Sequence, residues 1–161
     1  MTMTVTIRTR SDADFIKAIR LTQPVAPYDA ARVYVADEYA YFGKRVWLAL
    51  HGSTGVAPGS DDEKWEPADA PGVDLTGSVL QLMARAPAAN NYAPLAVTSA
   101  DGGDIEITDA EAGAFTLKLP LAQLGMMAAG TYDVSMIQIT ASGERLVVFA
   151  GRLIHSIGPT R

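Results

Sequence analysis

Apolar and polar residues alternate along much of this chain with the period of two that is typical of β-strands. Val5 and Ile7 alternate with Thr and Arg near the start, and Phe15, Ile19 and Leu21 fall on one side of the next segment. Turn-forming residues separate further alternating segments at intervals of about ten residues, which predicts an antiparallel sandwich or barrel. These segments are residues 78–85, 93–99, 104–108, 114–119, 131–140 and 144–155.

The turns between these strands carry recognisable signals. Asp101-Gly102-Gly103 is typical of a hairpin, so the strands on either side of it are expected to pair. Residues 141–143 predict a last hairpin, and residues 86–92 predict a turn rich in Pro and Asn. Residues 120–125 begin with Pro and end with Gly, which predicts a single helical turn. Residues 29–40 are compatible with a longer helix, although their β-branched and aromatic residues oppose it.

The pattern changes between residues 22 and 72. This stretch holds five of the nine prolines, four of the six tyrosines and both tryptophans. Within it, residues 38–42 and 45–51 read as a short hairpin around Gly43. We therefore expect a small aromatic-rich β-module over residues 22–72, inserted into an Ig-like antiparallel β-sandwich made of residues 1–21 and 73–161.

Charge and composition limit the classes of partner that the protein is expected to bind. The net charge of −5 opposes binding to a nucleic-acid backbone, which needs clustered Lys and Arg. The chain has no cysteine, so it forms no disulfide and no thiolate metal site. The first residues lack the apolar core of a signal peptide, and no apolar run reaches the ~18 residues of a membrane span. We expect a protein made in the bacterial cytoplasm, with no membrane partner.

Candidate chemistry is sparse. His51 and His155 each stand at a predicted strand end without an acidic neighbour in a motif, and residues 51–55, HGSTG, do not fit the G-x-S-x-G nucleophile elbow. Two acidic clusters favour turn chemistry, with calcium as the alternative for the first. We expect no enzyme activity, no metal and no cofactor. The clusters are Asp61, Asp62 and Glu63, and Asp101, Asp104 and Asp109.

The aromatic residues of the insertion allow two interpretations. Exposed aromatic rings stack well on the apolar faces of sugars, so Tyr39, Tyr41, Trp47 and Trp65 are candidates for a carbohydrate-binding platform. A module of about fifty residues also has little surface to bury, and large aromatic side chains are the most efficient way to give it a core. The pattern favours the core and leaves the platform open.

One tyrosine carries a more specific signal. Tyr132 follows Gly130 at the entrance of a predicted strand, as in the tyrosine corner of Ig-like sandwiches, where the hydroxyl bonds to backbone upstream. The alternative is an ordinary half-buried strand tyrosine.

The insertion resembles the small chitin-binding-type carbohydrate modules, which also occur within phage tail proteins. Their pattern runs from a tyrosine through a short strand and a glycine to an aromatic residue, a Pro-Gly loop and a closing tryptophan. The resemblance implies a small β-fold and a sugar ligand. The matching residues, in order, are Tyr34, Gly43, Trp47, Ala49, Pro58, Gly59 and Trp65.

The rest of the chain is similar to phage and prophage tail proteins related to the Ig-like N-terminal domain of baseplate upper proteins. The similarity rests on DLTG at residues 74–77, the I-x-I-x-D-x-x-x-G-x-F-T-L-x-L series at 105–119, the GTY strand at 130–132, and the closing GRL and PTR segments. It implies a structural virion component located in the tail or baseplate. Its expected partners are other tail proteins and copies of itself, as a trimer or hexamer.

Overall fold

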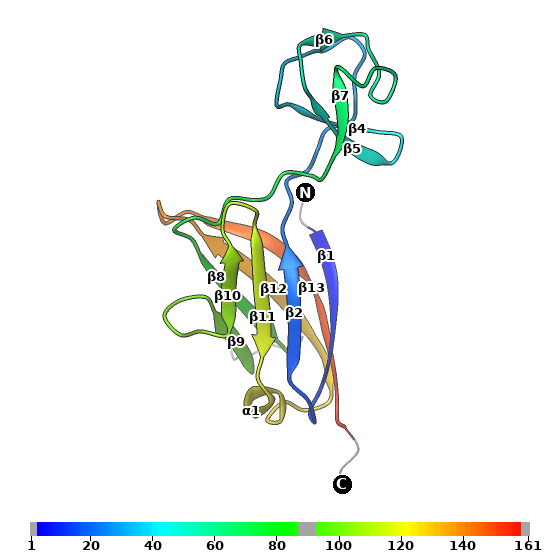
Figure 1. Ribbon diagram of the computed structural model, residues 1–161. Helices are drawn as coiled ribbons and strands as arrows, with labels where there is room; N and C mark the ends of the chain where they lie inside the picture. Colours follow the sequence, from blue (N-terminus) through cyan, green and yellow to red (C-terminus); the bar gives the residue numbers. More distant parts are fainter. Residues whose placement is uncertain (1–2, 87–92, 159–161) are drawn as a thin grey trace. The chain divides into compact units, whose positions relative to one another are not determined.

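The computed structural model describes residues 3–86 and 93–158 (Figure 1). Strands dominate these residues, and the one helix among them is the short α1 (Leu121–Leu124). The fold is therefore all-β, as the alternation predicted, and the single helical turn is confirmed. Residues 29–40 form no helix and contain instead the two-residue strand β3 (Val33–Tyr34), so that alternative was wrong.

The chain divides into two compact units. Residues 1–21 and 74–161 form the larger unit, and residues 22–73 form the smaller one. The sequence placed the end of the insertion at residue 72, one residue before the boundary in the structure. The chain leaves the larger unit once and returns to it once.

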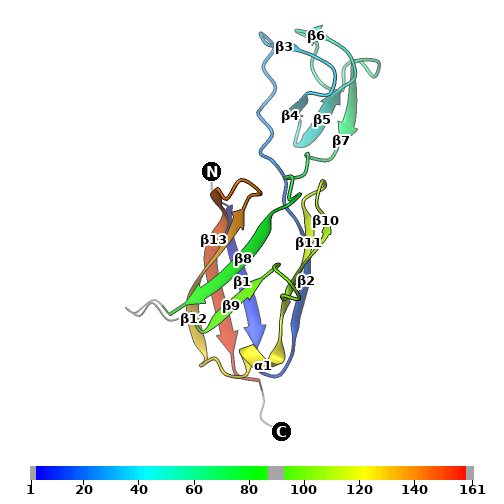
Figure 2. The same cartoon turned by 90° about the vertical axis from the view of Figure 1, so that its left-hand side faces the viewer.

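The larger unit is a sandwich of two β-sheets (Figures 1 and 2). In the lettering of Ig domains, β2, β11 and β10 correspond to strands B, E and D, and β8, β12 and β13 to strands C, F and G. The five-stranded sheet has the order β1 (Met3–Arg10), β13 (Arg145–Ser156), β12 (Gly130–Ile139), β8 (Val79–Arg85) and β9 (Leu95–Thr98). The three-stranded sheet has the order β10 (Ile105–Asp109), β11 (Ala114–Leu119) and β2 (Phe15–Arg20).

The predicted alternation produces the core of this sandwich. Every second residue of β8 is buried, namely Leu80, Leu82 and Ala84. The facing sheet contributes buried residues of β11 in the same rhythm. Because successive strand residues point to opposite faces, one apolar row from each sheet fills the space between them. The corresponding residues of the other strands are Phe115, Leu117 and Leu119 in β11, and Tyr132, Val134, Met136 and Gln138 in β12.

Two strand pairings differ from the prediction. The hairpin between β12 and β13 is confirmed, but the turn at residues 101–103 joins β9 to β10, which lie in different sheets and do not pair. The turn signal reports a local reversal of the chain and carries no information about the sheet that the next strand joins. The sandwich is also not fully antiparallel, because β1 runs parallel to β13. The predicted turn at residues 86–92 and the closing residues 159–161 lie largely outside the described residues.

Gly151 makes the parallel pairing of β1 with β13 sterically possible. In the pairing register Gly151 stands opposite Val5, and a Cβ atom added to Gly151 would overlap the Val5 backbone. Only glycine allows such an approach of two backbones. The first strand of the chain is thereby held at the edge of the five-stranded sheet.

The GTY and DLTG motifs each form a local hydrogen-bonded anchor of the sandwich. The Tyr132 hydroxyl donates a hydrogen bond to the Ala128 carbonyl oxygen at 2.7 Å, which is the predicted tyrosine corner. In the DLTG segment, the Asp74 carboxylate accepts hydrogen bonds from Thr76, and these bonds hold the pKa of Asp74 below its usual range. The buried Gln138 side chain donates to the Asp74 carbonyl oxygen and so ties this loop to β12.

The smaller unit has short strands and tight turns. Its three-stranded sheet has the order β4 (Tyr39–Phe42), β5 (Arg45–Ala49) and β7 (Trp65–Ala68), and β3 pairs with β6 (Ser53–Thr54). Gly43 and Lys44 both have positive φ, so the predicted hairpin turn is of type I′. At the base of the unit Thr22 and Gly72 form an antiparallel bridge, and the Gln23 amide donates to the Pro71 carbonyl oxygen at 2.8 Å.

Candidate functional site

Trp65 forms the centre of the small unit's core. It is 1% exposed, as is Tyr34, and the two rings meet edge to face with their centroids 5.1 Å apart. Tyr28 stacks on Tyr34 at 5.5 Å and meets Trp65 edge to face at 6.1 Å. The Trp65 Nε1 donates to the Val56 carbonyl oxygen at 2.9 Å, so the indole N–H is satisfied inside the unit. These contacts leave no open ring face on which a sugar could stack, and the place of Trp65 in the predicted platform is corrected.

Trp47 lies at the margin of the same core. It is partly buried against the cluster around Trp65, and its Nε1 donates to the Phe42 carbonyl oxygen at 3.1 Å. Gly59, with φ of +82°, lies so close that an added Cβ atom would come within 3.0 Å of the Trp47 ring. The Arg45 guanidinium is 5.7 Å from the ring centroid. The ring therefore already has neighbours, and its first role is to close the core.

Tyr39 and Tyr41 belong to the opposite face of the three-stranded sheet. In the pairing register Tyr39 faces Leu48 and Tyr41 faces Val46, whereas Trp47 faces Ala40. Because directly opposed residues point to the same side, the two tyrosines share one face and the two tryptophans share the other. The four predicted platform residues thus do not converge on one surface.

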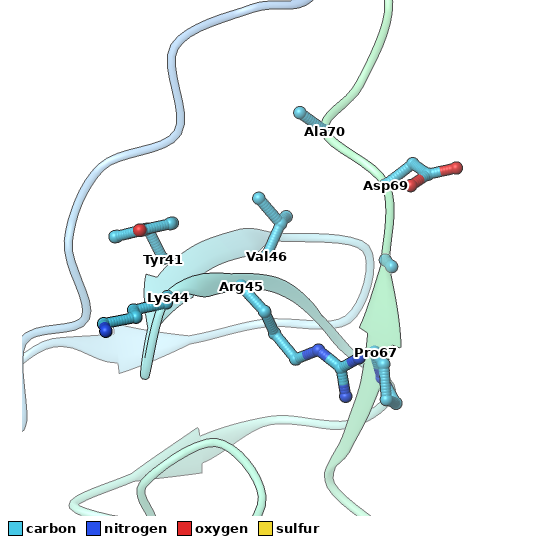
Figure 3. Close-up of a pocket in the computed structure, with 8 residues that line it drawn as sticks. Tyr41, Lys44, Arg45, Val46, Pro67, Asp69 and Ala70 are labelled. Carbon is cyan, nitrogen blue, oxygen red and sulfur yellow. The ribbon is translucent and has the colours of Figure 1, made fainter.

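An open groove of about 500 Å³ lies beside Tyr41, which is 45% exposed. Figure 3 shows Tyr41 and Val46 projecting to the same side of the hairpin, while Arg45 extends to the other side, toward Pro67. An exposed phenol ring beside cationic and carboxylate groups can stack on and hydrogen-bond a polar ligand. The groove is lined by Tyr41, Lys44, Arg45, Val46, Pro67, Ala68, Asp69 and Ala70.

The acidic and histidine candidates are dispersed. The Asp61 carboxylate accepts the Glu63 amide at 3.0 Å, which is the local turn chemistry that the sequence indicated. Over residues 3–86 and 93–158, no three His, Asp or Glu side chains gather in a metal-binding arrangement. His51 is exposed. His155 is 2% exposed, its Nδ1 lies 2.9 Å from the Thr9 hydroxyl, and burial lowers its pKa.

Sequence reasoning missed a second groove, which lies in the sandwich unit. It has a volume of about 410 Å³ and a largely apolar lining from β1 and β2. One signal for it is visible in the sequence, because Lys17 stands in phase with Phe15 and Ile19 on a strand face that is otherwise apolar. The lining residues are Val5, Thr6, Ile7, Arg8, Phe15, Lys17, Ile19, Leu117 and Phe149.

Comparison with protein-family models, with curated proteins and with solved structures gives no match for this chain. Among the described helices, none has the length and apolar character needed to cross a membrane.

Proposed function

We propose that the protein is a non-enzymatic structural component of a phage or prophage tail or baseplate, and that it acts by assembling with other proteins. The observation that carries the proposal is the placement of the tail-protein motifs at anchoring points of an Ig-like sandwich. The DLTG loop is tied to β12 through Gln138, and the GTY motif supplies the tyrosine corner. Both motifs thus stabilise the sandwich, as expected of a protein whose role is structural.

The edges of the two sheets support the same role. In the described residues β1 and β2 each pair on one side only, and β9 and β10 end the sheets on the other side. Strand edges are ready-made surfaces for adding a further chain. Copies that meet through such surfaces in a head-to-tail fashion form a closed ring when the rotation between neighbours closes, and a trimer or hexamer is the state that we propose.

Sedimentation velocity over a wide range of protein concentration tests self-assembly. We expect one discrete oligomer with the mass of a trimer or hexamer, and a chain that stays strictly monomeric would contradict it. Mass spectrometry of purified tail particles from the bacterium of origin tests the location. Absence of the chain from such particles would contradict a virion role.

A second candidate function is carbohydrate or receptor binding through the small unit, and the exposure of Tyr41 beside an open groove favours it. The platform would consist of Tyr39 and Tyr41, because the two tryptophans face the core. Titration with chito-oligosaccharides, followed by NMR, would then shift signals of β4 and β5. Tyr41→Ala should abolish those shifts, whereas Tyr41→Phe should keep the stacking surface and most of the binding. Shifts that persist in Tyr41→Ala would contradict this site.

A further inference from the structure

The groove of about 410 Å³ in the sandwich unit lies between β1 and β2. These two strands follow each other in the chain but belong to opposite sheets (Figures 1 and 2). Ile7, Leu117 and Phe149 contribute to it, and each is less than a tenth exposed. Phe15 and Ile19 of β2 are half-buried along it. The groove thus reaches the apolar interior of the sandwich.

β2 is an edge strand with an unused row of backbone groups. In many Ig sandwiches a first strand covers the edge of strand B, but here β1 pairs with β13, and in the described residues β2 pairs with β11 alone. The Leu21 amide donates to the Gly113 carbonyl oxygen at 2.9 Å, which sets the phase of the ladder. Because antiparallel ladders alternate, Ile16 and Ala18 direct their N–H and C=O groups to the free edge.

The charges of the groove have one sign. Among the described residues, its charged lining residues are Arg8 and Lys17, and no acidic residue lines it. Lys17 lies in the inward phase between Phe15 and Ile19, and it has no ion pair within the described part of the chain. A charged side chain that points inward from an edge strand makes non-specific pairing with other strands unfavourable. It also makes pairing favourable for a segment that brings a carboxylate to the same place.

We propose that this groove accepts an extended segment of a partner protein, which adds as a strand to the free edge of β2. The segment carries an acidic residue that meets Lys17, and apolar residues two positions away on either side that fill the groove. This spacing follows because alternate residues of a strand share one face. The inference rests on the proposed assembly role, since it names the surface and the chemistry by which a partner would dock.

The open backbone edge distinguishes an extended segment from other occupants. A small apolar ligand would fill the groove but would leave the outward groups of Ile16 and Ala18 unpaired. An added strand satisfies both groups and buries the exposed side of β2 at the same time, which is how strand addition obtains affinity from the backbone and specificity from alternate side chains. The outward Ile16 side chain, which is 64% exposed, offers further apolar contact on the outer face.

Synthetic peptides test the proposal with the full-length protein. The probe is a blocked peptide of about nine residues, the length of a long strand, which alternates Thr with Leu and has one central Glu in the Leu phase. The matched probe has Lys in place of that Glu. We expect the acidic peptide to bind about ten times more tightly than the basic one and to shift the NMR amide signals of Ile16 and Ala18.

Three variants sharpen the test. Ala18→Pro removes the outward N–H without touching the ladder to β11, so the protein should stay folded and bind the acidic peptide about ten times more weakly. Ala18→Ser keeps the N–H and should bind as the parent does. Lys17→Glu should reverse the preference, so that the basic peptide binds more tightly than the acidic one.

Equal binding of the two peptides would overturn the proposal. So would absence of binding at millimolar peptide, amide shifts confined to other strands, or unchanged binding by a folded Ala18→Pro variant. Sedimentation of the protein without peptide tests the assembly role separately. A monomer that binds the acidic peptide would contradict self-assembly and support the groove, whereas an oligomer that ignores both peptides would do the reverse.

Discussion

The two units of this chain solve the problem of forming a core in different ways. The sandwich buries rows of aliphatic residues from long strands, such as Leu80 and Leu82 of β8, between two extended sheets. The smaller unit has strands of two to five residues and buries two large rings, Tyr34 and Trp65, with Tyr28 packed against them. The sandwich therefore spreads its stability over many similar contacts, whereas the smaller unit concentrates it in a few.

This difference predicts where each unit is vulnerable. Removing one aliphatic side chain from the sandwich leaves most of its core in place. Removing one ring from the smaller unit removes a large share of its core.

Trp65→Ala should have the largest effect. Loss of a buried tryptophan costs about 3–5 kcal/mol, and a unit of about fifty residues is itself stable by only about 3–8 kcal/mol. We expect the smaller unit to unfold while the sandwich stays folded, which NMR would show as the loss of dispersed signals from residues 22–73 alone. The matched change, Leu82→Ala in the sandwich, should lower the sandwich's stability by about 2–5 kcal/mol and leave the smaller unit folded. Loss of both sets of signals in Trp65→Ala would contradict the independence of the units.

Gly59→Ala should have the next largest effect. A left-handed backbone costs a non-glycine residue about 1–2 kcal/mol, and the added Cβ atom would also press on the Trp47 ring at 3.0 Å. Gly43→Ala is the control, because Gly43 also has positive φ but its added Cβ atom would meet nothing within 4 Å. Denaturant unfolding of the smaller unit should show a greater loss of stability in Gly59→Ala than in Gly43→Ala. Equal losses of stability would contradict a destabilising contact between the added Cβ atom and Trp47.

Removing a single tyrosine hydroxyl should have a smaller effect on stability, and the effect should differ between the two units. Tyr132→Phe deletes the hydrogen bond to the Ala128 carbonyl oxygen and should lower the stability of the sandwich by about 1 kcal/mol. In the smaller unit, the buried Tyr28 hydroxyl has no hydrogen-bond partner among the described residues. Tyr28→Phe should therefore leave the stability unchanged or raise it slightly. Thermal unfolding of both variants checks the contrast, and a loss of similar size in Tyr28→Phe would contradict it.

The smallest effect should come from the titration of His155 in the sandwich. Burial lowers its pKa in the folded protein below the value of about 6.5 for an unfolded chain. As the pH falls through 6.5 the unfolded chain takes up the proton first, so the sandwich loses stability until the pH reaches the lower folded pKa. Unfolding midpoints between pH 8 and pH 5 should show this loss, and His155→Gln should reduce it. An equal pH dependence in the variant would assign the effect to other groups.

The sequence predicted the features that depend on local patterns. Alternation located β8 and β11, because each buries every second residue, and the glycine and tyrosine of GTY located the tyrosine corner. The sequence left the role of the tryptophans open, because the rhythm of β5 and β7 does not reveal which face of a small sheet packs inward. It predicted a wrong pairing at Asp101-Gly102-Gly103, since a turn signal does not name the neighbouring strand. The groove between β1 and β2 depends on contacts between distant segments. The sequence indicates it only through the position of Lys17, which alternates with the same phase as the inward residues of β2.

The bridge between Thr22 and Gly72 has a consequence for the history and the engineering of the protein. Paired strand residues have Cα atoms about 5 Å apart, so the chain enters and leaves the smaller unit at nearly the same point. A unit with such closely spaced ends can be gained, lost or exchanged while β2 and β8 keep their places in the sandwich. A tight turn of a few residues should be able to replace the whole smaller unit, and the sandwich should also accept an unrelated small domain at the same junction.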